Sequence, residues 1–187
     1  MKHYIFLLTA SLTLLPSPGF ADSQEIWNKL KTGGLVVLMR HMSVIKENNP
    51  LLRDASCAKE RKLSAKGKKQ AANIGKAFRD KNIPIEKVLT SPYCRTTDTA
   101  DITFGKSQPA NFLSVLHALT AKQADQYTEQ LTTTIGSYKG KGNLVFVTHE
   151  PNIAAIAFEQ VEMGAFLVLQ PTGEQEFDEL GKIKLQN

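Results

Sequence analysis

Two short apolar runs, residues 35–39 and 143–148, constrain the fold more than any other feature of this sequence. Runs of this kind are typical of strands that are buried on both faces, as the strands of a parallel sheet are. Between them the sequence has helical periodicity, above all over residues 64–81, which begin with Ser64 as the helix cap. Strands that alternate with helices predict an α/β fold, a three-layer sandwich with a mostly parallel central sheet flanked by helices.

Length and composition are those of one ordinary globular domain. The chain has 187 residues, of which 42% are hydrophobic and 22% charged, and these values exclude a wholly disordered or fibrous protein. Residues 42–62 are polar and irregular and predict a long loop, a feature that is often functional in compact domains. We expect further helices over residues 22–31, 91–104, 121–138 and 149–158, and further strands over residues 87–90, 112–116, 165–169 and 175–184.

The first 21 residues have the three-part pattern of a secretory signal peptide. Lys2 precedes an apolar stretch over residues 4–15, which is shorter than the ~20 residues needed to span a bilayer. Gly19 and Ala21 are the small residues expected before a cleavage after Ala21. We therefore expect residues 1–21 to be removed, leaving a single periplasmic or secreted domain over residues 22–187 with no membrane span.

Polar clusters follow three of the predicted strands, each at the carboxyl end of its strand. In open α/β sheets, ligands bind beyond the carboxyl ends of the strands. One fold assignment therefore brings two histidines, two arginines and a carboxylate to the same edge of the sheet. These residues are Arg40 and His41 after the first strand, Arg95 after the second, and His149 and Glu150 after the third.

These residue types suit a phosphate group. The fork of an arginine binds two phosphate oxygens at once, and a neutral histidine is a nucleophile at ordinary pH. We expect His41 to attack phosphorus, while Arg40, Arg95 and a protonated His149 hold the charged oxygens. The start of the helix at residues 91–92 adds backbone N–H groups. The net charge of +5 also favours an anionic ligand, and no metal or cofactor is expected.

Four segments of the chain resemble motifs of the histidine phosphatase superfamily, which includes phosphoglycerate mutases and histidine acid phosphatases. The resemblance covers about residues 34–157 and implies a phosphoglycerate mutase-like fold. It also implies that His41 becomes phosphorylated and that Arg40, Arg95 and His149 form the phosphate pocket. The segments are VVLMRHMS (residues 36–43), LSAKGKKQA (63–71), LTSPYCRTTDTA (89–100) and VFVTHEPNIAAI (145–156).

The resemblance leaves two candidates for the proton donor. In the acid phosphatase branch an acidic residue directly follows the second histidine, and Glu150 has that position here. In the mutase branch the acid lies in the middle of the chain, where this sequence offers only His117, so we favour Glu150. The family usually has glycine after the Arg-His pair. Met42 stands there instead, and we expect a narrower pocket or a different path of the loop.

The resulting hypothesis is an enzyme, a phosphoric monoester hydrolase that forms a phosphohistidine on His41. Its partner is a small anionic phosphorylated substrate. A phosphate-binding sensor without turnover is the alternative, and Met42 is its best support. A phosphomutase is a weaker alternative, since this short chain has few elements to cover the site. Nucleic-acid binding is not expected, because the aromatic content is only 7%.

Two cysteines, Cys57 and Cys94, are too few for a disulfide scaffold and too far apart for a zinc finger. In an oxidising compartment they either form a disulfide that holds the long loop beside Arg95 or remain free, and the sequence leaves both open. A group of cations in and after this loop is expected to be a solvated face, and so is Arg53. The group comprises Lys59, Arg61, Lys62, Lys66, Lys68 and Lys69.

Overall fold

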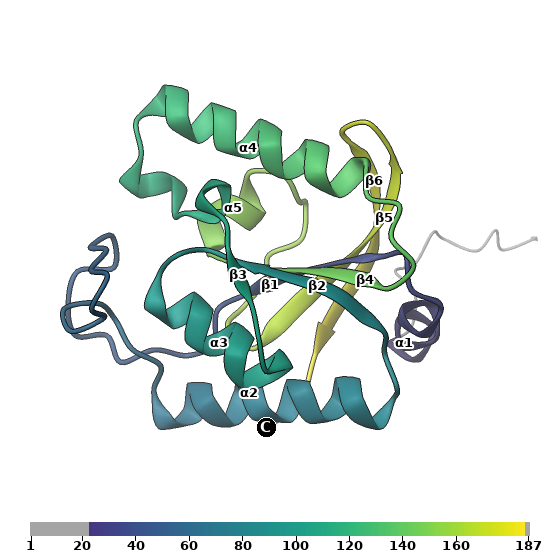
Figure 1. Ribbon diagram of the computed structural model, residues 1–187, viewed down its shortest axis with the longest axis horizontal. Coiled ribbons are helices and arrows are strands. Elements are labelled where there is room, and N and C mark those ends of the chain that lie inside the picture. Colours follow the sequence, from purple (N-terminus) through teal and green to yellow (C-terminus); the bar gives the residue numbers. More distant parts are fainter. Residues whose placement is uncertain (1–22, 186–187) are drawn as a thin grey trace, which may run out of the picture.

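The computed structural model describes residues 23–185, so the predicted signal peptide over residues 1–21 lies outside the described residues. Six strands form one sheet, and helices cover both of its faces (Figure 1). The strands are β1 (Val36–Arg40), β2 (Ile85–Thr90), β3 (Gln108–Pro109), β4 (Asn143–Thr148), β5 (Ala165–Gly173) and β6 (Glu176–Lys184). The helices are α1 (Ser23–Thr32), α2 (Ala65–Asp80), α3 (Cys94–Phe104), α4 (Ala121–Gly136) and α5 (Glu150–Ala154), with 3₁₀ turns η1 (Asn111–Leu113) and η2 (Leu116–Ala118).

The sheet is mixed, and the prediction of a mostly parallel sheet was wrong. Its order is β3-β2-β4-β1-β5-β6, in which β3, β2, β4 and β1 pair in parallel. Strand β5 pairs antiparallel with both β1 and β6. Only residues 174 and 175 separate β5 from β6, and so short a connection can join antiparallel strands but not parallel ones.

Side chains of the central strands alternate between two apolar clusters, one on each face of the sheet. Val37 and Met39 of β1 pack with α1 and α2, whereas Val36 and Leu38 pack with α4 and η1. This alternation has the period of two that a pleated strand imposes. Because both faces are buried, β1 and β4 are apolar almost throughout, which is why they were recognisable in the sequence.

Several predicted elements differ from the structure: the helix predicted over residues 149–158 ends at Ala154, and the strand predicted over residues 165–169 continues to Gly173. Two further differences have a clear physical reason. Helix α3 begins at Cys94 rather than at residue 91, because the Ser91 backbone N–H still donates to the Val147 carbonyl of β4. Residues 112–116 were predicted as a strand, but they run through the 3₁₀ turns η1 and η2. There Phe112 and Leu113 are both buried in the same cluster, an arrangement that an alternating strand does not allow.

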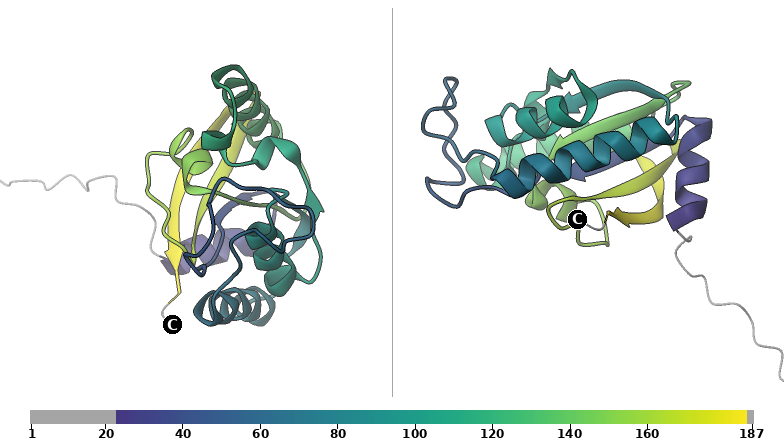
Figure 2. Two further views of the ribbon diagram at one scale, coloured as in Figure 1. Left: turned by 90° about the vertical axis from the view of Figure 1, so that its left-hand side faces the viewer. Right: turned by 90° about the horizontal axis from the view of Figure 1, so that it is seen from below.

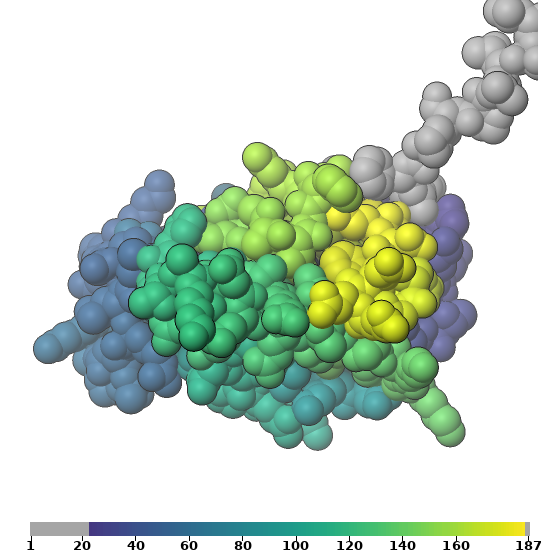
Figure 3. Space-filling model, turned by 90° about the horizontal axis from the view of Figure 1, so that it is seen from above, coloured from purple at the N-terminus to yellow at the C-terminus, as the bar shows by residue number. Residues whose placement is uncertain are grey.

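The loop between β1 and α2 projects beyond the start of α2, on the side where β1, β2 and β4 end (Figure 2). In the space-filling view its blue surface forms one end of the molecule (Figure 3). Ser64 caps α2 as predicted, since its Oγ accepts a hydrogen bond from the Gly67 N–H at 3.1 Å. Within residues 23–185, no helix is long and apolar enough to cross a membrane.

Candidate active site

A pocket of about 200 Å³ lies at the carboxyl ends of β1, β2 and β4. The parallel pairing of β1 with β4 brings the residues that follow them together, and the His41 N–H donates to the Thr148 carbonyl at 3.0 Å. All five residues that the sequence places at this edge line the pocket: Arg40, His41, Arg95, His149 and Glu150. A larger groove of about 720 Å³ lies elsewhere, between β2 and the carboxyl ends of α2 and α3, and none of these residues lines it.

His41 is held as a neutral imidazole in one tautomer. Its Nδ1 lies 2.9 Å from the Met42 carbonyl oxygen, and because a carbonyl only accepts, Nδ1 must carry the proton. Nε2 is then left with a lone pair. Burial lowers the pKa of His41 to about 3, and the nearby guanidinium groups of Arg95 and Arg40 add to that lowering. The ring is therefore uncharged at neutral pH.

His149 is neutral as well, in the opposite tautomer. Its Nδ1 lies 3.0 Å from Nη2 of Arg95, and a guanidinium only donates, so Nδ1 accepts. Its Nε2 then carries the proton and donates to Ser91 Oγ at 2.8 Å. Burial and the charge of Arg95 hold the pKa of His149 well below its usual value. The sequence led us to expect a protonated His149, whereas in this arrangement the ring accepts from arginine and has no place for a second proton.

Both arginines carry buried N–H groups without a hydrogen-bond partner among the described residues. Nη2 of Arg95 donates to the Pro50 carbonyl at 3.1 Å, but Nη1 has no partner. Arg40 donates through Nη1 to the Val161 carbonyl at 3.3 Å, and its Nε has no partner. Burial lowers the pKa of Arg95 to about 10, which leaves it charged at neutral pH. Unpaired buried donors on two cations are suited to bind an anion.

The expected backbone donors at residues 91–92 are not offered to a ligand. Because α3 starts at Cys94, its first N–H belongs to that residue, and it donates to Oε2 of Glu60 at 2.8 Å. Glu60 is only 1% exposed, although its polar surroundings in the sequence suggest a solvated loop. No local pattern in the sequence distinguishes this carboxylate from its exposed neighbours.

Met42 does not narrow the pocket with its side chain. It is fully buried in the apolar cluster that contains Leu63 and Ala71, and it is not among the residues that line the pocket. Its backbone N–H donates to Thr99 Oγ1 at 3.1 Å, and its backbone has no positive φ angle that would favour glycine. The departure from the usual glycine is therefore accommodated by the core.

Sequence reasoning missed one cation of the pocket. Arg61 was expected on a solvated face, but it lines the pocket and donates through Nε to the Asn48 carbonyl at 3.0 Å. Arg53 is exposed and does not line the pocket, and the lysines of the same group are exposed as expected. Both candidates for the proton donor, Glu150 and His117, line the pocket. Within residues 23–185, no three His, Cys, Asp or Glu side chains are grouped so as to hold a metal ion.

A family model, the histidine phosphatase superfamily (branch 1), matches residues 36–117. This match supports the resemblance of residues 36–117 to the histidine phosphatase superfamily. The matched part of the chain contains Arg40, His41 and Arg95, whereas His149 lies beyond it. A search of curated proteins found no significant match.

Several solved structures share the fold of this chain at low sequence identity. The protein histidine phosphatase SixA, solved with tungstate, is 14% identical with a TM-score of 0.59, over 80% of this chain and 96% of that one. The protein TTHB049 from Thermus thermophilus is 16% identical with a TM-score of 0.55, over 81% and 99%. The Rv3214 protein from Mycobacterium tuberculosis is 14% identical with a TM-score of 0.56, over 77% and 95%.

Acid should destabilise the fold through its two buried histidines. The pKa values of both are lowered in the folded state, that of His41 to about 3, so below about pH 6.5 the unfolded chain binds more protons than the folded one. The free energy of unfolding should therefore decrease as the pH falls below about 6.5, and His41 should contribute a slope of about 1.4 kcal/mol per pH unit down to about pH 3. Urea unfolding of the wild type and of His41→Asn at pH 7, 6, 5 and 4 measures how the free energy of unfolding depends on pH. The variant should have the shallower slope, and equal slopes would contradict the assignment of His41 as buried and neutral.

Proposed function

We propose that this protein hydrolyses a phosphomonoester through a phosphohistidine intermediate on His41. The match of residues 36–117 to the histidine phosphatase superfamily supports a phosphatase or mutase-like activity in general. The observation that supports the specific proposal is the His41 ring itself. Its proton is held on Nδ1 by the Met42 carbonyl, which leaves the Nε2 lone pair for attack in a pocket with two unpaired cationic donors.

In the first step, His41 Nε2 attacks phosphorus and forms a P–N bond, while the ester P–O bond breaks. The electron pair of the broken bond goes to the leaving oxygen, which takes a proton from Glu150. Arg40 and Arg95 neutralise charge on the remaining phosphate oxygens through the N–H groups that have no partner. Glu150 lies close enough to Arg40 to oppose, by its charge, the lowering of that arginine's pKa by burial.

His149 serves this step as an uncharged ring. Because its Nδ1 accepts from Arg95, it fixes the direction of that guanidinium rather than adding a cation. Ser91 Oγ accepts from Nε2 and holds the ring in this tautomer. The positive charge of the pocket therefore comes from arginines, and Arg61 adds a third.

In the second step, a water molecule attacks the phosphohistidine. Its oxygen forms the new bond to phosphorus, the P–N bond breaks, and Glu150 takes the water proton. Inorganic phosphate leaves and His41 returns to its neutral form. We further propose that the substrate is a small phosphorylated molecule in the periplasm or outside the cell. The removal of residues 1–21 on which this location depends stays a prediction.

Incubation of the purified protein with a ³²P-labelled aryl phosphate tests the proposal. We expect release of phosphate and a labelled protein whose label survives alkali but is lost in acid, as a phosphoramidate bond requires. Phosphate binding without turnover of any ester would instead indicate a sensor. Transfer of the label to an acceptor hydroxyl in preference to water would indicate a mutase.

A further inference from the structure

The loop over residues 45–62, here called the pocket loop, is attached to the start of α3 beside the phosphate-binding arginine. Nη2 of Arg95 donates to the Pro50 carbonyl at 3.1 Å, and the Tyr93 hydroxyl donates to the Leu51 carbonyl at 3.0 Å. Pro50 and Leu51 also line the pocket. The loop is thus both a wall of the site and a hydrogen-bond partner of the groups that form it.

A buried carboxylate makes the third attachment. Glu60 is 1% exposed, its Oε1 accepts from the Asp54 N–H at 2.8 Å, and its Oε2 accepts from the Cys94 N–H at 2.8 Å. These bonds place a negative charge at the amino terminus of α3, where the helix dipole stabilises it. The same charge acts on Arg95, since it opposes the lowering of that arginine's pKa by burial.

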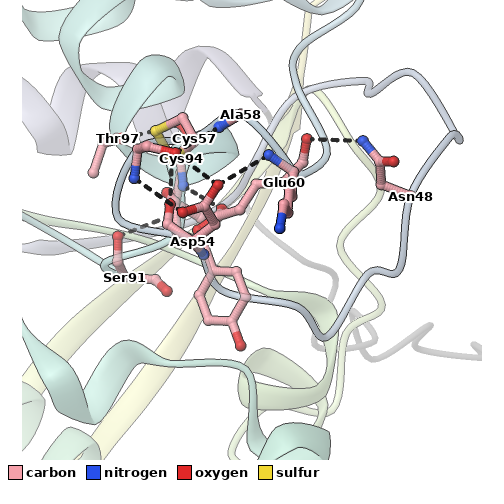
Figure 4. Close-up of a disulfide and its surroundings, with 12 residues drawn as sticks. Asn48, Asp54, Cys57, Ala58, Glu60, Ser91, Cys94 and Thr97 are labelled. Carbon is pink, nitrogen blue, oxygen red and sulfur yellow. Dashed lines mark hydrogen bonds between the residues drawn. A yellow bond between two sulfur atoms is a disulfide. The ribbon is translucent and has the colours of Figure 1, made fainter.

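A disulfide makes the fourth attachment, at the same residue of α3. Cys57 and Cys94 are bonded, and their Cα atoms lie 5.8 Å apart (Figure 4). Cys94 is therefore held to the pocket loop twice, through its sulfur and through its backbone N–H, and the next residue in the chain is Arg95. The close-up shows Glu60, Asp54 and the disulfide gathered at this one point (Figure 4).

We propose that Glu60 and the Cys57–Cys94 disulfide together position Arg95 for phosphate, so that phosphate affinity depends on the redox state of the two cysteines. This inference rests on the proposed function, in which Arg95 binds the phosphate. A dithiol gives two electrons and two protons to the disulfide, which becomes two thiols, while the dithiol becomes a cyclic disulfide. The pocket loop is then attached through hydrogen bonds alone.

The consequence for the site follows from the partners of Arg95. Its Nη2 donates both to the Pro50 carbonyl and to Nδ1 of His149. Its Nη1 has no partner among the described residues and can therefore bind the ligand. If the pocket loop moves, the Pro50 carbonyl moves with it, and so does Arg61, which lines the same pocket. Small displacements of a positioning group have large effects, and about 1 Å can cost on the order of 100-fold.

Competitive inhibition by inorganic phosphate tests the role of Glu60. Glu60→Gln should raise the inhibition constant for phosphate and KM by about 10-fold. Glu47→Gln, which removes an exposed carboxylate from the same loop, should change neither. In an Arg95→Lys background, Glu60→Gln should have no further effect on phosphate inhibition. An unchanged inhibition constant in Glu60→Gln, or the same fold-change in both backgrounds, would overturn the proposal, whatever happens to thermal stability.

Reduction provides a second test that does not depend on whether Glu60→Gln folds. Treating the wild type with a dithiol, with complete reduction verified by thiol labelling and mass spectrometry, should raise KM and the phosphate inhibition constant by about 10-fold. Removal of the dithiol and reoxidation should restore both. The double variant Cys57→Ser/Cys94→Ser should start at the raised values and not respond. Values unchanged by full reduction would overturn the proposal.

An error in the proposed function and an error in the positioning role would give different experimental results. If the oxidised wild type neither turns over an aryl phosphate nor binds inorganic phosphate, the proposed function is wrong. If it does both, but either Glu60→Gln or full reduction leaves phosphate affinity unchanged, only the positioning role is wrong.

Discussion

Replacing His41 by alanine should reduce kcat/KM for an aryl phosphate at least about 10³-fold, since removal of a nucleophile leaves only the binding contribution of the rest of the site. Among the described residues that line the pocket, His149 is the group most similar to it. His149 is neutral too, but both of its ring nitrogens are engaged, with Arg95 and Ser91, so no lone pair is free for attack. The measurement is the rate at which phosphate or the aryl alcohol is released, at saturating and at limiting concentrations of substrate.

A matched control separates loss of chemistry from loss of fold. Lys76→Ala removes an exposed cation whose salt bridge is to Asp80, one turn further along α2. It should leave kcat/KM unchanged. Circular dichroism and a cooperative thermal transition show whether His41→Ala is folded at the temperature of the assay. Activity near that of the wild type in a folded His41→Ala protein would refute the phosphohistidine mechanism.

Glu150→Gln should slow alkyl phosphates by about 10²–10⁴-fold while affecting activated aryl phosphates far less. An alkoxide is too basic to leave without a proton, whereas a nitrophenolate leaves unassisted. The experiment is a series of phosphomonoesters with leaving groups of graded pKa, in which the variant should show a much steeper dependence of kcat/KM on that pKa. Glu129→Gln, an exposed carboxylate of α4, is the control and should retain the wild-type dependence.

The same series decides between the two candidate acids. His117 also lines the pocket, so His117→Asn is measured beside Glu150→Gln. Equal losses on alkyl and aryl substrates in Glu150→Gln would remove Glu150 as the acid. A steepened dependence in His117→Asn, with none in Glu150→Gln, would assign the role to His117.

Much of the fold was predictable because burial on both faces leaves a strong mark in the sequence. Strand β4 was predicted with the bounds that the structure shows, and α2 with the serine that caps it. The sequence did not show that β5 and β6 make the sheet mixed. Whether a strand runs parallel or antiparallel depends on which strand it pairs with, and that pairing is set only in the folded chain. The predicted strand at residues 112–116 failed because a short apolar segment fits a buried turn as well as a strand.

By itself, the sequence determined that five of the side chains of the pocket meet. Parallel strands end at a common edge, so Arg40, His41, Arg95, His149 and Glu150 share a pocket once β1, β2 and β4 are recognised. Only the tertiary structure decided their protonation states and partners. Desolvation and hydrogen bonds set a pKa, and both come from segments far away in the chain: Pro50 against Arg95, Ser91 against His149, and Glu60 against the start of α3. No local pattern encodes such neighbours, because each exists only after the chain has folded.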